Sequence, residues 1–273
     1  MPDMIKMALC QPAVVDNKAE NLHKAAEMVR RAAKSGCQIA VLPEMFNCPY
    51  QSELFPSYAE SFPNGETIRL LARLAKEENI VIVGGSIPEK DGERVYNTSF
   101  IFAENGELIG RHRKLHLFDV DIKAGTVFKE SDTLTAGNDI TVVTACGVKL
   151  GIGICYDIRF IELAREMTDR GAQVLIYPAA FGLVTGPAHW ELLMKARAID
   201  NQVFVIGAAP ARTLGAKYQA YGHSIAVDPW GRIVAEADET ESLLTIVLDL
   251  KTIASVREEL PILKHRRPKI YHN

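Results

Sequence analysis

One short pattern occurs twice in this 273-residue chain, and it constrains the fold more than any other feature. Residues 36–46 (GCQIAVLPEMF) align without gaps with residues 171–181 (GAQVLIYPAAF). Each copy follows a segment whose apolar residues have helical spacing, and an earlier strand-like segment precedes each helix. A helix–strand unit used twice predicts an α/β protein with internal pseudo-two-fold symmetry, in which two sheets pack face to face with helices outside.

Apolar periodicity divides the remaining chain into strands and helices. The predicted strands are 6–11, 38–43, 80–85, 97–102, 107–111, 141–144, 148–154, 173–178, 202–208, 224–228 and 243–248. The predicted helices are 19–35, 67–78, 186–199 and 251–259. A further helix begins just after Cys155, with Asp157 as its N-cap and Gly171 as its C-terminal stop. No linker interrupts residues 1–273, so a single domain is expected, with loops over 45–63 and 115–138.

The composition is typical of a soluble globular protein, with 48% hydrophobic and 24% charged residues. A net charge of −3 gives no support for nucleic acid or an anionic membrane as a partner. The N-terminus has no signal-peptide pattern, and no segment approaches the roughly 20 apolar residues of a membrane span. The five cysteines are odd in number and lack C-x-x-C spacing, so we expect reduced thiols in a cytoplasmic protein.

Three reactive side chains, Glu44, Lys114 and Cys155, follow predicted strands, and strand ends are where α/β proteins collect functional groups. A buried carboxylate can accept a thiol proton, while an ammonium and the backbone N–H of Tyr156 could stabilise an oxyanion. Each residue taken alone also fits a structural role: a buried strand cysteine, a loop carboxylate or a solvated lysine. The repeat favours chemistry at Glu44, because the second copy has Ala179 at the corresponding position.

Motifs for other chemistries are weak or absent. The sequence has no P-loop, no H-E-x-x-H and no G-x-S-x-G, and the glycines at 151 and 153 lack the third glycine of a dinucleotide loop. His112 and His116 have i, i+4 spacing but no third metal-ligand candidate nearby in sequence. We therefore expect neither metal nor organic cofactor. A papain-type cysteine–histidine pairing stays open, although no local signature supports it.

Three motifs together resemble the nitrilase superfamily of carbon–nitrogen hydrolases. They are LPEMF (42–46), RHRKLHLF (111–118) and GICYDIRF (153–160). The resemblance implies a four-layer αββα sandwich and a Glu–Lys–Cys triad at Glu44, Lys114 and Cys155. It also implies that Glu130 positions substrate and water. The family usually forms dimers, so we expect a homodimer with the tail, about 260–273, at the subunit interface.

Further segments resemble the omega-amidase branch: 117–121 (LFDVD), 128–131 (FKES), 185–190 (TGPAHW) and 200–203 (DNQV). This implies a small-molecule amide substrate of the 2-oxoglutaramate or 2-oxosuccinamate type, cleaved to carboxylate and ammonia through a thioester. Arg159 or Lys123 would bind the distal carboxylate. The expected pocket walls are Tyr50, Phe118, Phe181 and Trp190. Two alternatives remain: a sister amidase for deaminated glutathione or an N-carbamoyl amine, and a non-catalytic relative that binds a partner or senses oxidants.

Overall fold

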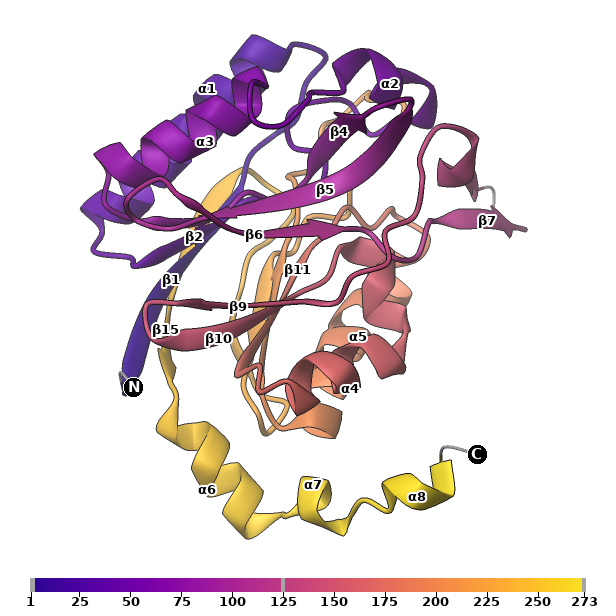
Figure 1. The fold of residues 1–273 in the computed structure, drawn as a ribbon. Coiled ribbons are helices and arrows are strands. Elements are labelled where there is room, and N and C mark those ends of the chain that lie inside the picture. Colours follow the sequence, from indigo (N-terminus) through magenta and orange to yellow (C-terminus); the bar gives the residue numbers. More distant parts are fainter. Residues whose placement is uncertain (1–2, 124–125, 272–273) are drawn as a thin grey trace.

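In the computed structural model, which describes residues 3–123 and 126–271, two large sheets pack face to face (Figure 1). The first sheet has the order β15 (Ser242–Asp249), β1 (Met4–Gln11), β2 (Ile39–Val41), β3 (Val81–Val83), β5 (Arg94–Phe102) and β4 (Ile87–Asp91), and β6 (Leu108–Arg113) also pairs with β5. The second has the order β14 (Ile233–Glu236), β13 (Ile225–Val227), β12 (Phe204–Ala208), β11 (Val174–Pro178), β10 (Val148–Ile152) and β9 (Thr141–Ala145).

Two helices cover the outer face of each sheet. Helices α1 (Lys18–Lys34) and α3 (Glu66–Glu77) pack on the first sheet, and α4 (Ile161–Asp169) and α5 (Gly186–Asn201) pack on the second. Alternation along the strands supplies both interfaces. In β1, Met7 faces the second sheet while Ala8 faces the helices. The predicted four-layer αββα sandwich is therefore confirmed.

The repeated sequence pattern occupies equivalent places in the two sheets. Strand β2 lies between β1 and β3, and both pairings are parallel. Strand β11 lies between β10 and β12 in the same way. Each parallel triplet is wound by its own helix pair, so the internal pseudo-two-fold follows the sequence repeat. Because parallel strands end at one edge, the residues after β2, β10 and β11 come to the same side of the molecule.

Local signals explain the ends of the main helices. The Asn17 side chain caps α1 by accepting a hydrogen bond from the Glu20 N–H at 3.1 Å. Helix α4 ends as predicted at Gly171, whose φ of +93° suits glycine. The Gly171 N–H donates to Thr168 O, and the Ala172 N–H donates to Met167 O, which is the Schellman pattern.

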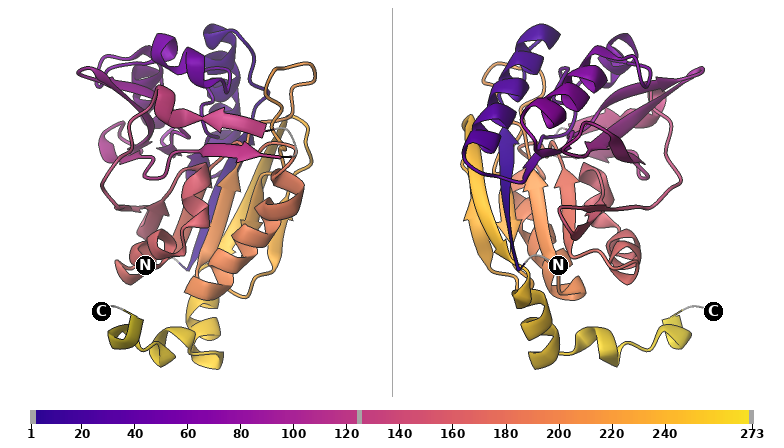
Figure 2. Two further views of the ribbon diagram at one scale, coloured as in Figure 1. Left: turned by 90° about the vertical axis from the view of Figure 1, so that its right-hand side faces the viewer. Right: turned by 60° about the vertical axis from the view of Figure 1, so that its left-hand side comes forward.

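The C-terminal segment extends away from the sandwich (Figure 2). It contains α6 (Lys251–Glu259), α7 (Ile262–His265) and α8 (Pro268–Tyr271). Arg266 forms an ion pair with Asp169 of α4 at 2.7 Å, and the Gln202 side chain donates to Leu260 O. Leu260 and Ile270 stay exposed. Residues 272–273, the end of the predicted interface tail, lie outside the described residues.

The structure corrects several sequence-based expectations. Cys155–Arg159 is a 3₁₀ helix, and α4 begins only at Ile161 with Phe160 at its N-cap, so Asp157 does not cap α4. Residues 115–138 are not a simple loop. They contain a hairpin of β7 (Asp119–Ile122) and β8 (Thr126–Lys129) and a 3₁₀ turn at Glu130–Asp132.

The expected loop over 45–63 also contains a 3₁₀ turn (Ser52–Leu54) and the short helix α2 (Phe55–Tyr58). Strands β4 and β14 were not predicted. The 229–231 turn leads from β13 into β14, whereas β15 lies in the other sheet beside β1. Short edge strands with exposed side chains lack the apolar alternation by which a strand is recognised.

Candidate active site

Four predicted side chains converge where both sheets end. Glu44 follows β2, Lys114 follows β6, Glu130 follows β8 and Cys155 follows β10. All four are buried, and Lys114 and Glu44 are 70 residues apart in sequence. Folding therefore collects an ammonium, two carboxylates and a thiol from separate elements at the common strand edge.

Lys114 is the centre of the charged cluster. Its Nζ donates to Glu44 Oε1 and to Glu130 Oε1, each at 2.9 Å. Asn97 Nδ2 also donates to Glu44 Oε1 at 2.8 Å, and Tyr50 OH donates to Glu130 Oε1 at 3.0 Å. Buried charges need such partners, because desolvation otherwise costs several kcal/mol per ion. The lysine is thus fixed between two acids.

The two glutamates differ in how their second oxygen is satisfied. Glu130 Oε2 accepts from the Phe118 N–H at 2.7 Å. Glu44 Oε2 is buried and has no hydrogen-bond partner of good geometry within residues 3–123 and 126–271. A carboxylate oxygen without a donor is available for a proton, whereas Glu130 is fully engaged. Glu44 is therefore better placed than Glu130 to act as a base.

Burial and charge shape the proton affinities of this cluster. Burial raises the pKa of Glu44, and the neighbouring Lys114 charge opposes the rise. Burial and the Glu44 charge hold the pKa of the Cys155 thiol well above its usual value, again against Lys114. Burial by itself would lower the pKa of Lys114, but Glu130 and Glu44 outweigh it and raise that pKa well above the ordinary lysine value. The resting site therefore holds a neutral thiol beside a carboxylate and an ammonium.

Cys155 occupies a strained turn. Its φ is +46°, a left-handed conformation that costs a non-glycine residue of order 1–3 kcal/mol. The 3₁₀ helix Cys155–Arg159 starts at this residue. The N–H of Tyr156 is therefore among the first-turn groups that have no partner inside the helix. It is available to stabilise negative charge next to the sulfur.

A narrow cavity of about 10 Å³, the space of roughly one water molecule, lies at Cys155. It is lined by Tyr50, Phe118, Cys155, Tyr156, Arg159, Ala180, Phe181, Gly182, Thr185 and Tyr218. A vestibule of about 580 Å³ shares several of these residues, among them Tyr50, Phe118 and Tyr218. Of the predicted pocket walls, Tyr50, Phe118 and Phe181 line the cavity.

The prediction for Trp190 is wrong. Trp190 is buried behind Phe181, with ring centroids 4.9 Å apart, and its Nε1 donates to His223 O at 2.7 Å. Its indole thus has its partner in the core and does not line the cavity. Lys123 is exposed and also does not line it. The wall residues Tyr218 and Thr185 were missed, because their loops carry no periodic signal.

Arg159 is the cation that lines the cavity. Its Nη1 lies 3.2 Å from His189 Nδ1, and its guanidinium carbon lies 5.1 Å from the Phe181 ring centroid. Its Nε is buried without a hydrogen-bond partner in the described part of the chain. Burial lowers the pKa of Arg159 from its usual value, with Cys155 and Tyr156 acting against this. An unsatisfied guanidinium donor can bind an anionic group.

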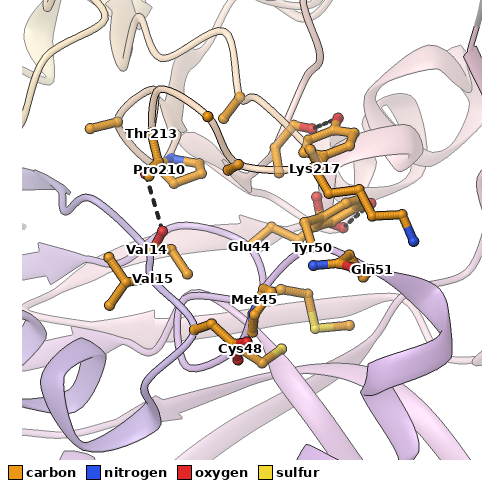
Figure 3. Close-up of a pocket in the computed structure, with 18 of the residues that line it drawn as sticks. Val14, Val15, Glu44, Met45, Cys48, Tyr50, Gln51, Pro210, Thr213 and Lys217 are labelled. Atoms are coloured by element: carbon orange, nitrogen blue, oxygen red, sulfur yellow. Dashed lines mark hydrogen bonds between the residues drawn. The ribbon is translucent and has the colours of Figure 1, made fainter.

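Figure 3 shows a second cavity, of about 370 Å³, in which Glu44 is one of the lining residues. Its wall includes Val14, Met45, Cys48 and Thr213, and it shares Tyr50, Ala180 and Tyr218 with the Cys155 cavity. The Tyr50 and Tyr218 rings are in contact, with centroids 4.7 Å apart. The two cavities therefore meet at this tyrosine pair.

Two searches of the described residues bear on other functions. No group of three or more His, Cys, Asp or Glu side chains there has a metal-binding arrangement. Within the same residues, no helix combines the length and apolarity needed to cross a membrane.

The chain is similar to known carbon–nitrogen hydrolases over almost its whole length. Residues 6–258 match the carbon–nitrogen hydrolase family model. The omega-amidase NIT2 of Mus musculus is 48% identical over 266 residues, 97% of this chain and 96% of the relative. The Homo sapiens omega-amidase NIT2 is 44% identical over the same shares. Among solved structures, Saccharomyces cerevisiae Nit3, a member of branch 10 of the nitrilase superfamily, has 45% identity and a TM-score of 0.91, covering 98% of both chains.

Proposed function

Because this chain belongs to the carbon–nitrogen hydrolase family, in the omega-amidase-like branch of the nitrilase superfamily, we propose that it cleaves the terminal amide of a small omega-amido acid. The chain is an amidase by its family. The substrate class proposed is the 2-oxoglutaramate or 2-oxosuccinamate type, and the products are a carboxylate and ammonia. The observation that carries the proposal is Lys114 Nζ, 2.9 Å from both Glu44 and Glu130, buried in the cluster that holds Cys155.

The first half-reaction forms a thioester. Glu44 accepts the thiol proton as the Cys155 sulfur attacks the amide carbon. The tetrahedral oxyanion lies between the Lys114 ammonium and the Tyr156 N–H. Glu44 then donates its proton to the nitrogen, the C–N bond breaks and ammonia leaves. The raised pKa values of Glu44 and Cys155 support this proton exchange, because both groups are shifted in the same direction by the same burial.

The second half-reaction hydrolyses the thioester. Glu44 takes a proton from a water molecule, which attacks the thioester carbon, and the proton passes to the departing sulfur. Glu130 keeps Lys114 and Tyr50 in place by its two hydrogen bonds and so orients the groups around this water. No step in this scheme involves a metal or an organic cofactor.

The distal carboxylate of the substrate is assigned to Arg159. This guanidinium lines the Cys155 cavity and has a buried Nε without a partner in the described chain. Phe118, Phe181 and Tyr50 would contact the short carbon chain between the two ends. The rival substrate classes are deaminated glutathione and N-carbamoyl amines, which a sister amidase would cleave.

Ammonia release from a panel of amides tests the proposed function. The panel contains 2-oxoglutaramate, 2-oxosuccinamate, deaminated glutathione, an N-carbamoyl amine and a neutral aliphatic amide. We expect the highest kcat/KM for the first two, and an acyl adduct on Cys155 in intact-mass spectra after brief exposure. A higher kcat/KM for another member would contradict the substrate assignment. No release from any amide would favour a non-catalytic binding or redox role.

We also infer a homodimer in a reducing, cytoplasmic compartment, formed as a single domain. The extended tail supports the dimer, since Leu260 and Ile270 are exposed apolar residues on it. The free thiols of all five cysteines support the compartment, because oxidation of Cys155 would remove the nucleophile. Light scattering of the full chain and of a chain ending at Glu259 tests the dimer. An unchanged mass would contradict a role for the tail.

A further inference from the structure

Asp157 lies two residues after Cys155, buried and outside the reaction scheme above. Its carboxylate accepts four hydrogen bonds. Two come from backbone N–H groups, Ile154 to Oδ2 at 2.9 Å and His116 to Oδ1 at 3.0 Å. Two come from imidazoles, His112 Nε2 to Oδ2 at 3.1 Å and His116 Nδ1 to Oδ1 at 2.7 Å. One carboxylate is therefore saturated by donors from two distant chain segments.

Those two segments are the ones that carry the proposed nucleophile and the proposed ammonium. His112 and His116 lie two residues before and two residues after Lys114. Ile154 directly precedes Cys155. Asp157 thus connects the backbone on either side of Lys114 to the strained turn at Cys155.

We propose that Asp157, with His112 and His116, is a positioning group that fixes the Cys155 sulfur relative to Lys114. The inference rests on the proposed function, since it assigns these residues to the same reaction. The left-handed φ of Cys155 needs such support, because strained backbone persists only where surrounding contacts over-determine it. The Asp157 bond to the Ile154 N–H closes this turn from inside.

Other contacts complete the brace. Arg197 of α5 donates through Nε to Ile158 O at 2.7 Å and through Nη2 to Arg159 O at 3.0 Å. His112 Nδ1 is 3.2 Å from Thr141 Oγ1 on β9. Hydrogen bonds to Asp157 from both histidines lower the pKa of its carboxyl against the effect of burial, so it stays ionised in the working range. The turn is thus held from the first sheet by Asp157 and from the outer helix by Arg197.

His116 permits a matched test, because it makes two separable contacts. Its Nδ1 bonds Asp157, and its ring stacks on Phe160 with centroids 3.5 Å apart. His116→Asn places an amide donor near the Nδ1 position but loses the ring. His116→Phe keeps a ring against Phe160 but loses the donor. His116 is partly exposed, with 30% of its side chain accessible, so neither replacement is forced into a closed core.

We expect His116→Phe to lower kcat by about 10- to 100-fold, with KM within about threefold of wild type, as for other misplaced reacting groups. His116→Asn is expected to keep at least about ten times more of kcat than His116→Phe. Alkylation of Cys155 by iodoacetamide, followed by peptide mass mapping, should show the same order of rates. A role in ring stacking alone predicts the reverse order.

Equal kcat values and equal alkylation rates for the two variants, or a slower Asn variant, would overturn the proposal. The alkylation arm keeps this test separate from the proposed function. If the wild-type chain releases no ammonia from any amide, the proposed function fails. The order of Cys155 alkylation rates then still decides whether Asp157 and His116 position the thiol.

Discussion

The two halves of the sandwich share a local sequence and a local fold, but they end in opposite chemistry. Strand β2 is followed by Glu44, whose carboxylate is buried against Lys114 and Asn97. Strand β11 is followed by Ala179, which is buried in the apolar cluster beneath α4 and α5. The difference teaches that the backbone repeat provides two equivalent strand ends, while only one of them is surrounded by cationic and amide donors.

The first strands of the two triplets make the same contrast in reverse. Strand β1 ends at Gln11, whose amide is satisfied on both sides: Nε2 donates to Asp238 O at 2.7 Å, and Oε1 accepts from the Ser224 N–H at 2.8 Å. Strand β10 leads into Cys155, where the backbone is strained. The acid comes from one half and the thiol from the other, so the site needs both halves.

The largest expected effect concerns the thiol. Cys155→Ala should lower amide hydrolysis by about 10⁴-fold or more while leaving the fold intact, because no other group can form the thioester. Steady-state ammonia release and circular dichroism measure the two effects. Cys146→Ala is the matched control, since Cys146 also has a positive φ, of 49°, in the β9–β10 turn. Retained hydrolysis by Cys155→Ala would reject the scheme.

Glu44→Gln should lower kcat by about 10³-fold, within the range of general acid–base catalysis. The glutamine keeps the size of the side chain but cannot accept the thiol proton. Burial raises the pKa of Glu44, so the carboxylate is lost on acidification sooner than an ordinary glutamate. Wild-type kcat/KM should therefore rise with pH through an acid limb above the usual glutamate range. A kcat within tenfold of wild type for Glu44→Gln would contradict the role.

Ala179→Glu introduces the acid into the other half. Without a cationic partner for this buried position, we expect a loss of about 3 kcal/mol in the free energy of unfolding. Urea denaturation measures it, and Ala254→Glu on the exposed face of α6 is the control, expected within about 0.5 kcal/mol. A similar loss for both variants would show that the two strand ends do not differ in this respect.

The smallest expected effect is on substrate binding. Arg159→Ala should raise KM for an anionic omega-amido acid about tenfold, the worth of one partly exposed charged hydrogen bond. KM for a neutral aliphatic amide should change less than about twofold, because that substrate has no distal carboxylate. An unchanged KM for the anionic amide would remove Arg159 from the binding site.

Sequence patterns predicted the parts of this molecule that depend on local periodicity. The repeat gave the αββα layers, since alternating and helical spacing describe how each element is buried. The strand ends also pointed to Glu44, Lys114 and Cys155 as a group, and the structure brings them into one cluster. Their catalytic roles stay predictions.

Contacts between distant segments could not be predicted in the same way. Asn97 lies within an ordinary strand pattern, and only the folded chain shows its amide 2.8 Å from Glu44. Asp157 looked like a helix cap because it precedes a helical pattern, but its oxygens are taken by His112 and His116, which lie more than 40 residues earlier in the sequence. Trp190 shares a helix with inward-facing residues, and periodicity does not distinguish a cavity wall from the core behind it.

The narrow space at Cys155 has a consequence for which second reactant the enzyme accepts. A chamber of about 10 Å³ admits a molecule the size of water or ammonia but not an alcohol or a primary amine with a carbon chain. Once the acyl group occupies the vestibule side, bulky acceptors are screened out by size. The acyl-enzyme is thereby committed to hydrolysis, and transfer to cellular amines is suppressed without any residue devoted to that discrimination.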